Sequence, residues 1–207
     1  DITKQLPDVG ANLGIETIEW VSFEDVDGKL WDDSKNAPFN SNDYPNSASE
    51  GIFFVGLEEN GNIYAFILNK DGTSSLVNTL DRGISDVMGL NYDKDQKLLW
   101  AETDNGYNNM LSVIKLNGEK DPQIVHVDPP KDMPTNLNNE GFVIIPSDTD
   151  YLDAYWFKDG ENIEALRNAK VYKEYYSNLG FEKELADIIK ASDIENRPDG
   201  YVTITFE

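Results

Sequence analysis

Glutamates that stand at the start of apolar segments are the residues whose type and spacing best suit chemistry in this sequence. Glu16, Glu50 and Glu140 each open a strand-like run, as in Glu50-Gly-Ile-Phe-Phe-Val. If these segments repeat around a common axis, their carboxylates converge and repel one another, and a bound cation or protonation relieves that repulsion. Carboxylates suit Ca²⁺, which takes about six to eight oxygen ligands. The alternative is that these glutamates bond backbone amides and hold neighbouring segments together.

Residues beside these openings extend the candidate site. Asp86 and Asn139 stand near two of the openings, where both would add oxygen ligands to a metal ion. Arg82, in the loop 81–86, is the best candidate for contact with an anionic ligand. An ion pair with Asp81 or Asp86 is the simpler explanation of its position.

His126 is the single histidine, so any Ser-His-Asp chemistry would have to use it. The chain has no Gly-x-Ser-x-Gly nucleophile motif, and one histidine is too few for a histidine-based zinc site. We expect His126 to face solvent from a strand. A pair of carboxylates acting as acid and base remains open, and the sequence does not locate it.

The aromatic residues fall into two predicted groups. The tryptophans, one per repeat, are expected in the core: Trp20, Trp31, Trp100 and Trp156. Tyr44 and Tyr107 lie in more polar segments, where exposed rings would stack on sugars or peptides. Tyr107 and Arg82 are therefore the candidate ligand-binding residues.

Short strands joined by tight turns are the elements expected to position these residues. An opening of one polar, one small and several apolar residues recurs after 34, 38 and 52 residues, at Glu16, Glu50, Met88 and Glu140. The strands predicted to follow are 63–68, 98–102, 110–116, 123–127, 152–157 and 165–172. Repeats of about 40 residues built from antiparallel strands favour propeller blades over a β-sandwich. We therefore predict an all-β, β-propeller-like domain.

Two loops and the C-terminal segment depart from this pattern. Residues 32–49 and 128–139 are polar or proline-rich and are predicted to be surface loops. We assign residues 1–176 to the propeller-like domain and residues 177–207 to a helix, a linker and a terminal strand. Apolar spacing predicts the helix over 181–189, and alternation predicts the strand over 201–206. That strand either closes the domain or begins a following module.

The segment Met88-Gly-Leu-Asn-Tyr-Asp, continued by Leu98-Leu-Trp-Ala-Glu-Thr-Asp104, resembles propellers of the SdiA-regulated and phytase-like esterase group. Gluconolactonase-type propellers show a similar Glu-Gly opening, whose glutamate binds a divalent metal in that family. Glu50 and Glu140 match that position, whereas Thr17 replaces the glycine after Glu16 and Met88 interrupts the acidic ring. The resemblance spans about residues 14–172 and implies about five or six blades. Four openings then imply a small propeller, a degenerate blade or part of a larger ring.

A second resemblance concerns the C-terminal segment Asn196-Arg-Pro-Asp-Gly-Tyr-Val-Thr-Ile-Thr-Phe206. It is similar to module junctions in Gram-positive cell-wall-anchored surface proteins. This resemblance implies that the chain is an extracellular or cell-wall-anchored, adhesin-like part of a longer protein.

Composition restricts the classes of partner. Lys and Arg number 17 against 39 Asp and Glu, which gives a net charge of −22 and argues against nucleic acid and anionic lipid as partners. The chain has no cysteine and no apolar run long enough to insert in a membrane. The leading expectation is a secreted recognition or structural module, calcium-stabilised, that binds a glycan, a host protein or a small molecule. The alternative is a metal-dependent hydrolase of the lactonase, esterase or phytase-like type. Completion of the fold by another segment or chain is a further expectation.

Overall fold

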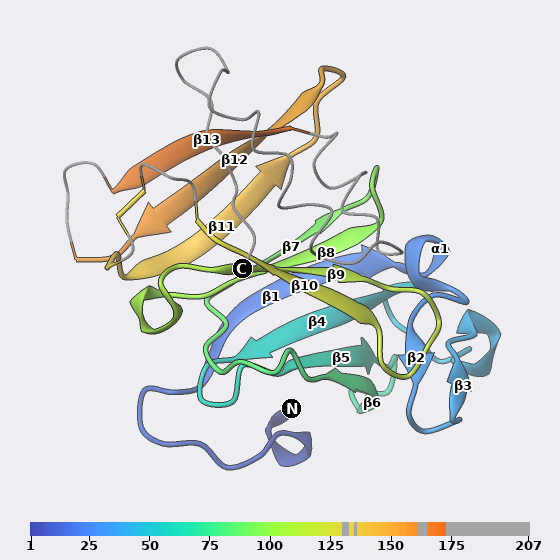
Figure 1. The fold of residues 1–207 in the computed structure, drawn as a ribbon. Helices are drawn as coiled ribbons and strands as arrows, with labels where there is room; N and C mark the ends of the chain where they lie inside the picture. The colour runs from blue at the N-terminus through green and yellow to red at the C-terminus, as the bar shows by residue number, and fades with distance from the viewer. Residues whose placement is uncertain (130–132, 135, 161–164, 173–207) are drawn as a thin grey trace.

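A computed structural model describes residues 1–129, 133–134, 136–160 and 165–172 (Figure 1). Almost all regular structure in this part is antiparallel β-sheet, which confirms the predicted all-β class. The sheets do not close into a ring within the described ranges, so the propeller arrangement stays a prediction. The helix predicted over 181–189, the strand over 201–206 and the domain boundary at 177 lie outside the described residues.

Three sheets contain most of the strands. The first sheet has the order β1-β4-β5-β6, with bounds Ile15–Ser22, Gly51–Leu57, Ile63–Leu68 and Ser74–Leu80. The second sheet has the order β10-β9-β8-β7, with β7 to β10 at Gly89–Asp93, Leu98–Glu102, Leu111–Lys115 and Gln123–Val127. The third sheet has the order β11-β12-β13, with bounds Asn139–Ile145, Tyr151–Lys158 and Leu166–Tyr172.

The long connection between β1 and β4 has structure of its own. It contains the helix α1 (Phe23–Val26), the small hairpin of β2 (Trp31–Asp32) and β3 (Ala37–Pro38), and a 3-10 turn at Ser41–Asp43. Two more 3-10 turns lie at Thr3–Gln5 and Asn105–Tyr107. The prediction of a long surface loop over 32–49 is therefore correct only in part.

The first strands of the three sheets lie side by side, with β7 between β1 and β11 (Figure 1). Side chains link them to neighbouring backbone: Thr17 Oγ1 accepts the Leu90 N–H at 2.9 Å, and Glu19 Oε1 accepts the Tyr92 N–H at 2.9 Å. Asn91 Oδ1 likewise accepts the N–H of Ile144 at 2.9 Å. Residue numbers rise together in the two bonds between β1 and β7. They also rise together between β7 and β11, where Gly89 lies against Phe142 and Asn91 bonds Ile144, so the three strands run in the same direction.

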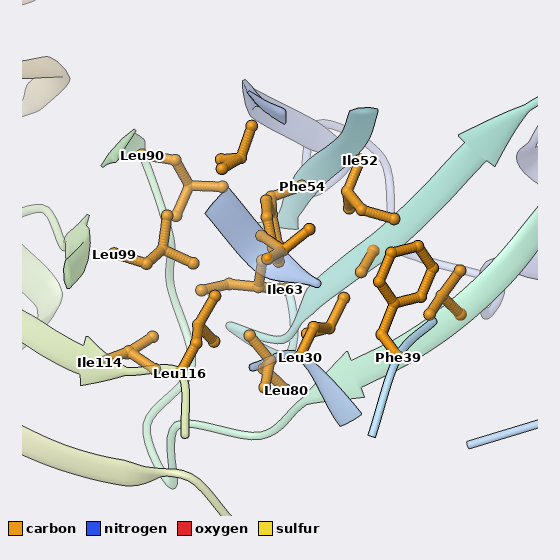
Figure 2. Close-up of a cluster of buried hydrophobic side chains, with 14 of the residues drawn as sticks. Leu30, Phe39, Ile52, Phe54, Ile63, Leu80, Leu90, Leu99, Ile114 and Leu116 are labelled. Carbon is orange, nitrogen blue, oxygen red and sulfur yellow. The ribbon is translucent and has the colours of Figure 1, made fainter. Parts of the chain in front are cut away.

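The core lies between the stacked sheets. One apolar cluster joins the first and second sheets, and Figure 2 shows part of it, with Phe54 and Ile63 from one side meeting Leu99 and Ile114 from the other. A second cluster joins the second and third sheets and includes Trp100. Each sheet thus buries one face, or both, against the next, which is how layered β-domains gain most of their stability.

Within the three large sheets, the predicted strands match the observed ones closely, with one omission and one wrong assignment. The omission is β6, whose run Ser-Ser-Leu-Val-Asn-Thr-Leu is too polar to be recognised as a strand. The wrong assignment concerns the repeat, because the openings at Glu16 and Glu50 begin β1 and β4, which pair within one sheet. These two openings therefore do not start separate blades.

Candidate functional site

An acidic end forms where the first strands begin. This end contains Glu16 near the start of β1, Glu58 just after β4 and Glu140 near the start of β11, and the charge of Glu16 acts on the other two carboxyls. Burial raises the pKa of Glu58, and the charges of Glu16 and Asp104 add to this rise. Burial also raises the pKa of Glu140, followed by repulsion from Glu16. The structure therefore brings Glu16 and Glu140 together, as the sequence predicted, and adds Glu58.

Asp86 lies beside this group in a strained conformation. Its φ of 74° is unusual for a residue other than glycine, and its Oδ2 accepts the Asp104 N–H at 3.1 Å. Its other carboxyl oxygen is buried without a hydrogen-bond partner. Burial, followed by the neighbouring Asp104 carboxyl, raises the pKa of Asp86 to about 8.

Glu102 at the end of β8 is the most deeply buried acid of this end. It has no exposed surface, and neither carboxyl oxygen has a hydrogen bond of standard geometry. Burial raises its pKa well above the ordinary value, although the adjacent Asn139 amide favours the charged form. Asn139 is also fully buried with an unsatisfied amide group. Sequence reasoning found Asn139 and missed Glu102, because Glu102 lies on a second strand and not at an opening.

The structure separates Glu50 from the other predicted metal ligands. Glu50 precedes β4, beside the C-terminal end of β1, whereas Glu16 lies at the opposite end of the same strand pair. Within the described residues, no group of three or more acidic or histidine side chains is arranged to hold a metal ion. Calcium binding therefore remains a prediction for this end of the molecule.

Arg82 has a structural position. Its side chain is buried, and it donates to the Gly61 carbonyl at 2.9 Å, to Ser112 Oγ at 3.0 Å and to the Asp86 carbonyl. Burial lowers the pKa of its guanidinium to about 10. These bonds occupy the group that was predicted to contact an anion.

The other predicted ligand residue and the histidine are also held by protein groups. Tyr107 shares a hydrogen bond of 2.8 Å between its hydroxyl and that of Ser85. His126 Nδ1 lies 3.0 Å from Ser112 Oγ, and burial, followed by the nearby Arg82 charge, lowers the pKa of His126. Ser112 has no exposed surface, so this Ser-His contact is closed to a substrate.

A cleft of about 570 Å³ lies at the other end of the first sheet, beside α1 and the segment 41–50. Trp20 of β1 lines it, and this indole is 48% exposed, so the prediction that Trp20 lies in the core is wrong. Trp100 and Trp156 are buried as predicted. The further lining residues are Ser22, Phe23, Glu24, Ser41, Asn42, Tyr44, Pro45, Ser47, Ser49, Glu50 and Lys70.

Hydrogen bonds and ring contacts hold the aromatic walls of the cleft in place. The Tyr44 hydroxyl donates to Asp32 Oδ2 at 2.6 Å, and the ring stacks on Phe39 at a centroid distance of 5.5 Å. Burial and the bond to Asp32 raise the pKa of Tyr44 to about 12, which keeps the hydroxyl protonated. Trp20 lies directly against Gly51, where an added Cβ would come within 2.3 Å of the indole nitrogen. Both rings are thus positioned by the fold before any ligand binds.

Two polar residues of the cleft have features that packing alone does not explain. Ser47 is 6% exposed, and its hydroxyl has no hydrogen-bond partner. Glu50 adopts a φ of 49°, a conformation that costs free energy in any residue with a Cβ. Its carbonyl accepts the Phe23 N–H at 2.9 Å, so the fold fixes this backbone. Unsatisfied polar groups and strained residues concentrate at binding sites.

Comparison of the chain with protein-family models, with curated proteins and with solved structures finds no match in any of the three. The proposed membership of an esterase-like or gluconolactonase-type propeller group therefore has no support beyond the all-β fold. No helix in the described part of the chain is long and apolar enough to cross a bilayer. The function must be argued from the cleft and from the acidic end.

Proposed function

We propose that this chain is a non-catalytic recognition module of an extracellular or cell-wall surface protein, and that it binds glycans in the cleft beside Trp20. The exposed indole of Trp20 is the observation on which this proposal rests. A half-exposed indole in a concave site offers an apolar platform that a ligand can cover. The acidic composition and the absence of cysteine are compatible with a bacterial surface location.

The lining of the cleft matches the chemistry of a sugar. One face of a pyranose ring presents C–H groups, which pack on an aromatic ring, while its edge presents hydroxyls that donate and accept hydrogen bonds. Trp20 supplies the ring, and the exposed residues Asn42 and Glu50 supply amide and carboxylate partners. A few polar groups placed around an apolar platform are typical of ligand sites.

A glycan array followed by calorimetric titration tests this proposal. We expect Trp20→Ala to weaken glycan binding more than tenfold, because central aromatic anchors contribute about 2 kcal/mol or more. Ile18→Ala is the matched control, since Ile18 is 62% exposed on the same strand and lies outside the cleft. Thermal unfolding of both variants verifies that they fold. Unchanged affinity of Trp20→Ala, or capture of peptides in place of glycans, contradicts the proposal.

The acidic end supports a second candidate, a calcium-dependent hydrolase in which the three sheets are consecutive blades of a propeller. The same-direction arrangement of β1, β7 and β11 is the feature that favours blades, and further sheets from another segment or chain would complete the ring. In the metal-free chain Asp86 has a pKa of about 8, which suits a general acid that does not itself bind the ion. Unfolding with and without Ca²⁺, followed by esterase and phosphatase assays, tests this candidate.

A further inference from the structure

We infer that the cleft selects neutral sugar rings and excludes sialylated or sulfated ones, with Glu50 as the residue that sets this preference. This inference rests on the proposed glycan-binding function and adds the class of sugar. It follows from the charged residues of the lining, and the backbone conformation of Glu50 provides a way to test it.

The lining is rich in hydrogen-bond acceptors and carries a negative balance. Of the residues that line the cleft, Glu24 and Glu50 are acidic, and Lys70 is the single cation. Sites for carboxylate or sulfate groups usually present arginine in a bidentate geometry, and the lining contains no arginine. The whole chain, with a net charge of −22, adds a repulsive field for any anion that approaches.

Neutral hydroxyls suit the same groups. A carboxylate accepts strong, charge-assisted hydrogen bonds from sugar hydroxyls. The amide of the exposed residue Asn42 can both donate to and accept from a sugar hydroxyl. Lys70 can donate a hydrogen bond to a neutral sugar oxygen.

The conformation of Glu50 allows the effect of its side chain on binding to be separated from its effect on stability. Glycine adopts a φ of 49° without steric cost, so Glu50→Gly relieves strain while it removes the carboxylate. We expect this variant to unfold about 2–4 °C higher than the wild type and to bind neutral glycans at least tenfold more weakly. A residue with only a structural role would not combine a gain in stability with a loss of binding.

Titration of paired glycans tests the inference, using neutral members of the array and the same glycans with sialic acid or sulfate added. We expect the anionic forms to bind at least tenfold more weakly, and Glu50→Gln to reduce that difference. Glu59→Gln is the charge-matched control, because Glu59 is exposed beyond the opposite end of β4. High salt should also reduce the difference, since it screens exposed charges.

The outcomes separate this inference from the function on which it rests. Trp20-dependent binding of the anionic forms, at equal or higher affinity, leaves the glycan-binding function intact and overturns the selectivity. A Glu50→Gln variant that discriminates as the wild type does overturns the role of Glu50. The absence of any Trp20-dependent glycan binding overturns the function and the inference together.

Discussion

Protonation of Asp86 provides a quantitative test of the acidic end. Burial, followed by the adjacent Asp104, raises the pKa of Asp86 from 3.8 to about 8. In the interval between these values the folded chain binds a proton that the unfolded chain has released. The free energy of unfolding contributed by this group is therefore complete below about pH 4 and is lost as the pH rises through about 8.

The expected magnitude follows from the size of the shift. At about 1.4 kcal/mol per pKa unit, a fully buried and isolated carboxyl would contribute about 6 kcal/mol. Asp86 is half-buried and interacts with Asp104, so solvent screening reduces the contribution. We expect about 2–3 kcal/mol to be lost between about pH 5 and pH 8.5.

Urea unfolding of the wild type and Asp86→Asn across this range measures the loss. Asparagine keeps an oxygen for the Asp104 N–H and tolerates the φ of 74°. Because asparagine does not titrate, the variant lacks the pH-dependent contribution of Asp86 to stability. We expect the stability of the variant relative to the wild type to grow by about 2–3 kcal/mol as the pH rises. Asp81→Asn, at an exposed position of the same loop, should follow the wild type. Parallel curves for Asp86→Asn and the wild type would refute this reasoning.

Further predictions concern two turns, at Gly61 and at Gly72, and the acidic end. Gly61→Ala should cost more than about 2 kcal/mol, because a Cβ there would lie 2.1 Å from the Ile84 carbonyl oxygen at a φ of 65°. Gly72→Ala, which has a φ of 84° and open space around it, should cost only about 1 kcal/mol by urea unfolding. Millimolar Ca²⁺ should raise the thermal midpoint of the wild type above its value in EDTA, and Glu140→Gln should abolish that rise. An equal midpoint in both buffers argues against the calcium site and the hydrolase candidate.

The strand pattern could be predicted from the sequence because apolar runs and turn residues mark most strands. Which face of β1 is buried could not be predicted from the sequence. The face that carries Trp20 was expected in the core, and it is the exposed face. Thr17 and Glu19 face the neighbouring sheet and accept backbone N–H groups, while Ile18 and Trp20 point outward. Alternation along a strand reveals two faces and does not tell which one meets a partner.

The candidate sites were predictable to different extents. The proximity of Glu16 and Glu140 could be predicted, because residues near the starts of same-direction strands share one end of the stack. The metal-binding role of these two residues, and of Asp86 and Asn139, stays a prediction. Glu50 was misplaced because its opening resembles the others although β4 runs against β1. The cleft could not be predicted, since it depends on how the connection 23–50 folds against the first sheet.

The second and third sheets are each built from one continuous stretch of chain, residues 89–127 and 139–172. Their strands pair with sequence neighbours, so little loop entropy is lost before the pairing begins. Each sheet can therefore form as soon as its own residues are available, as during synthesis from the N-terminus. The first sheet is different, because β1 must wait for β4 across the connection that shapes the cleft. Assembly of the cleft beside Trp20 is thus tied to the pairing of β1 with β4, and a chain with a formed cleft has already completed that pairing.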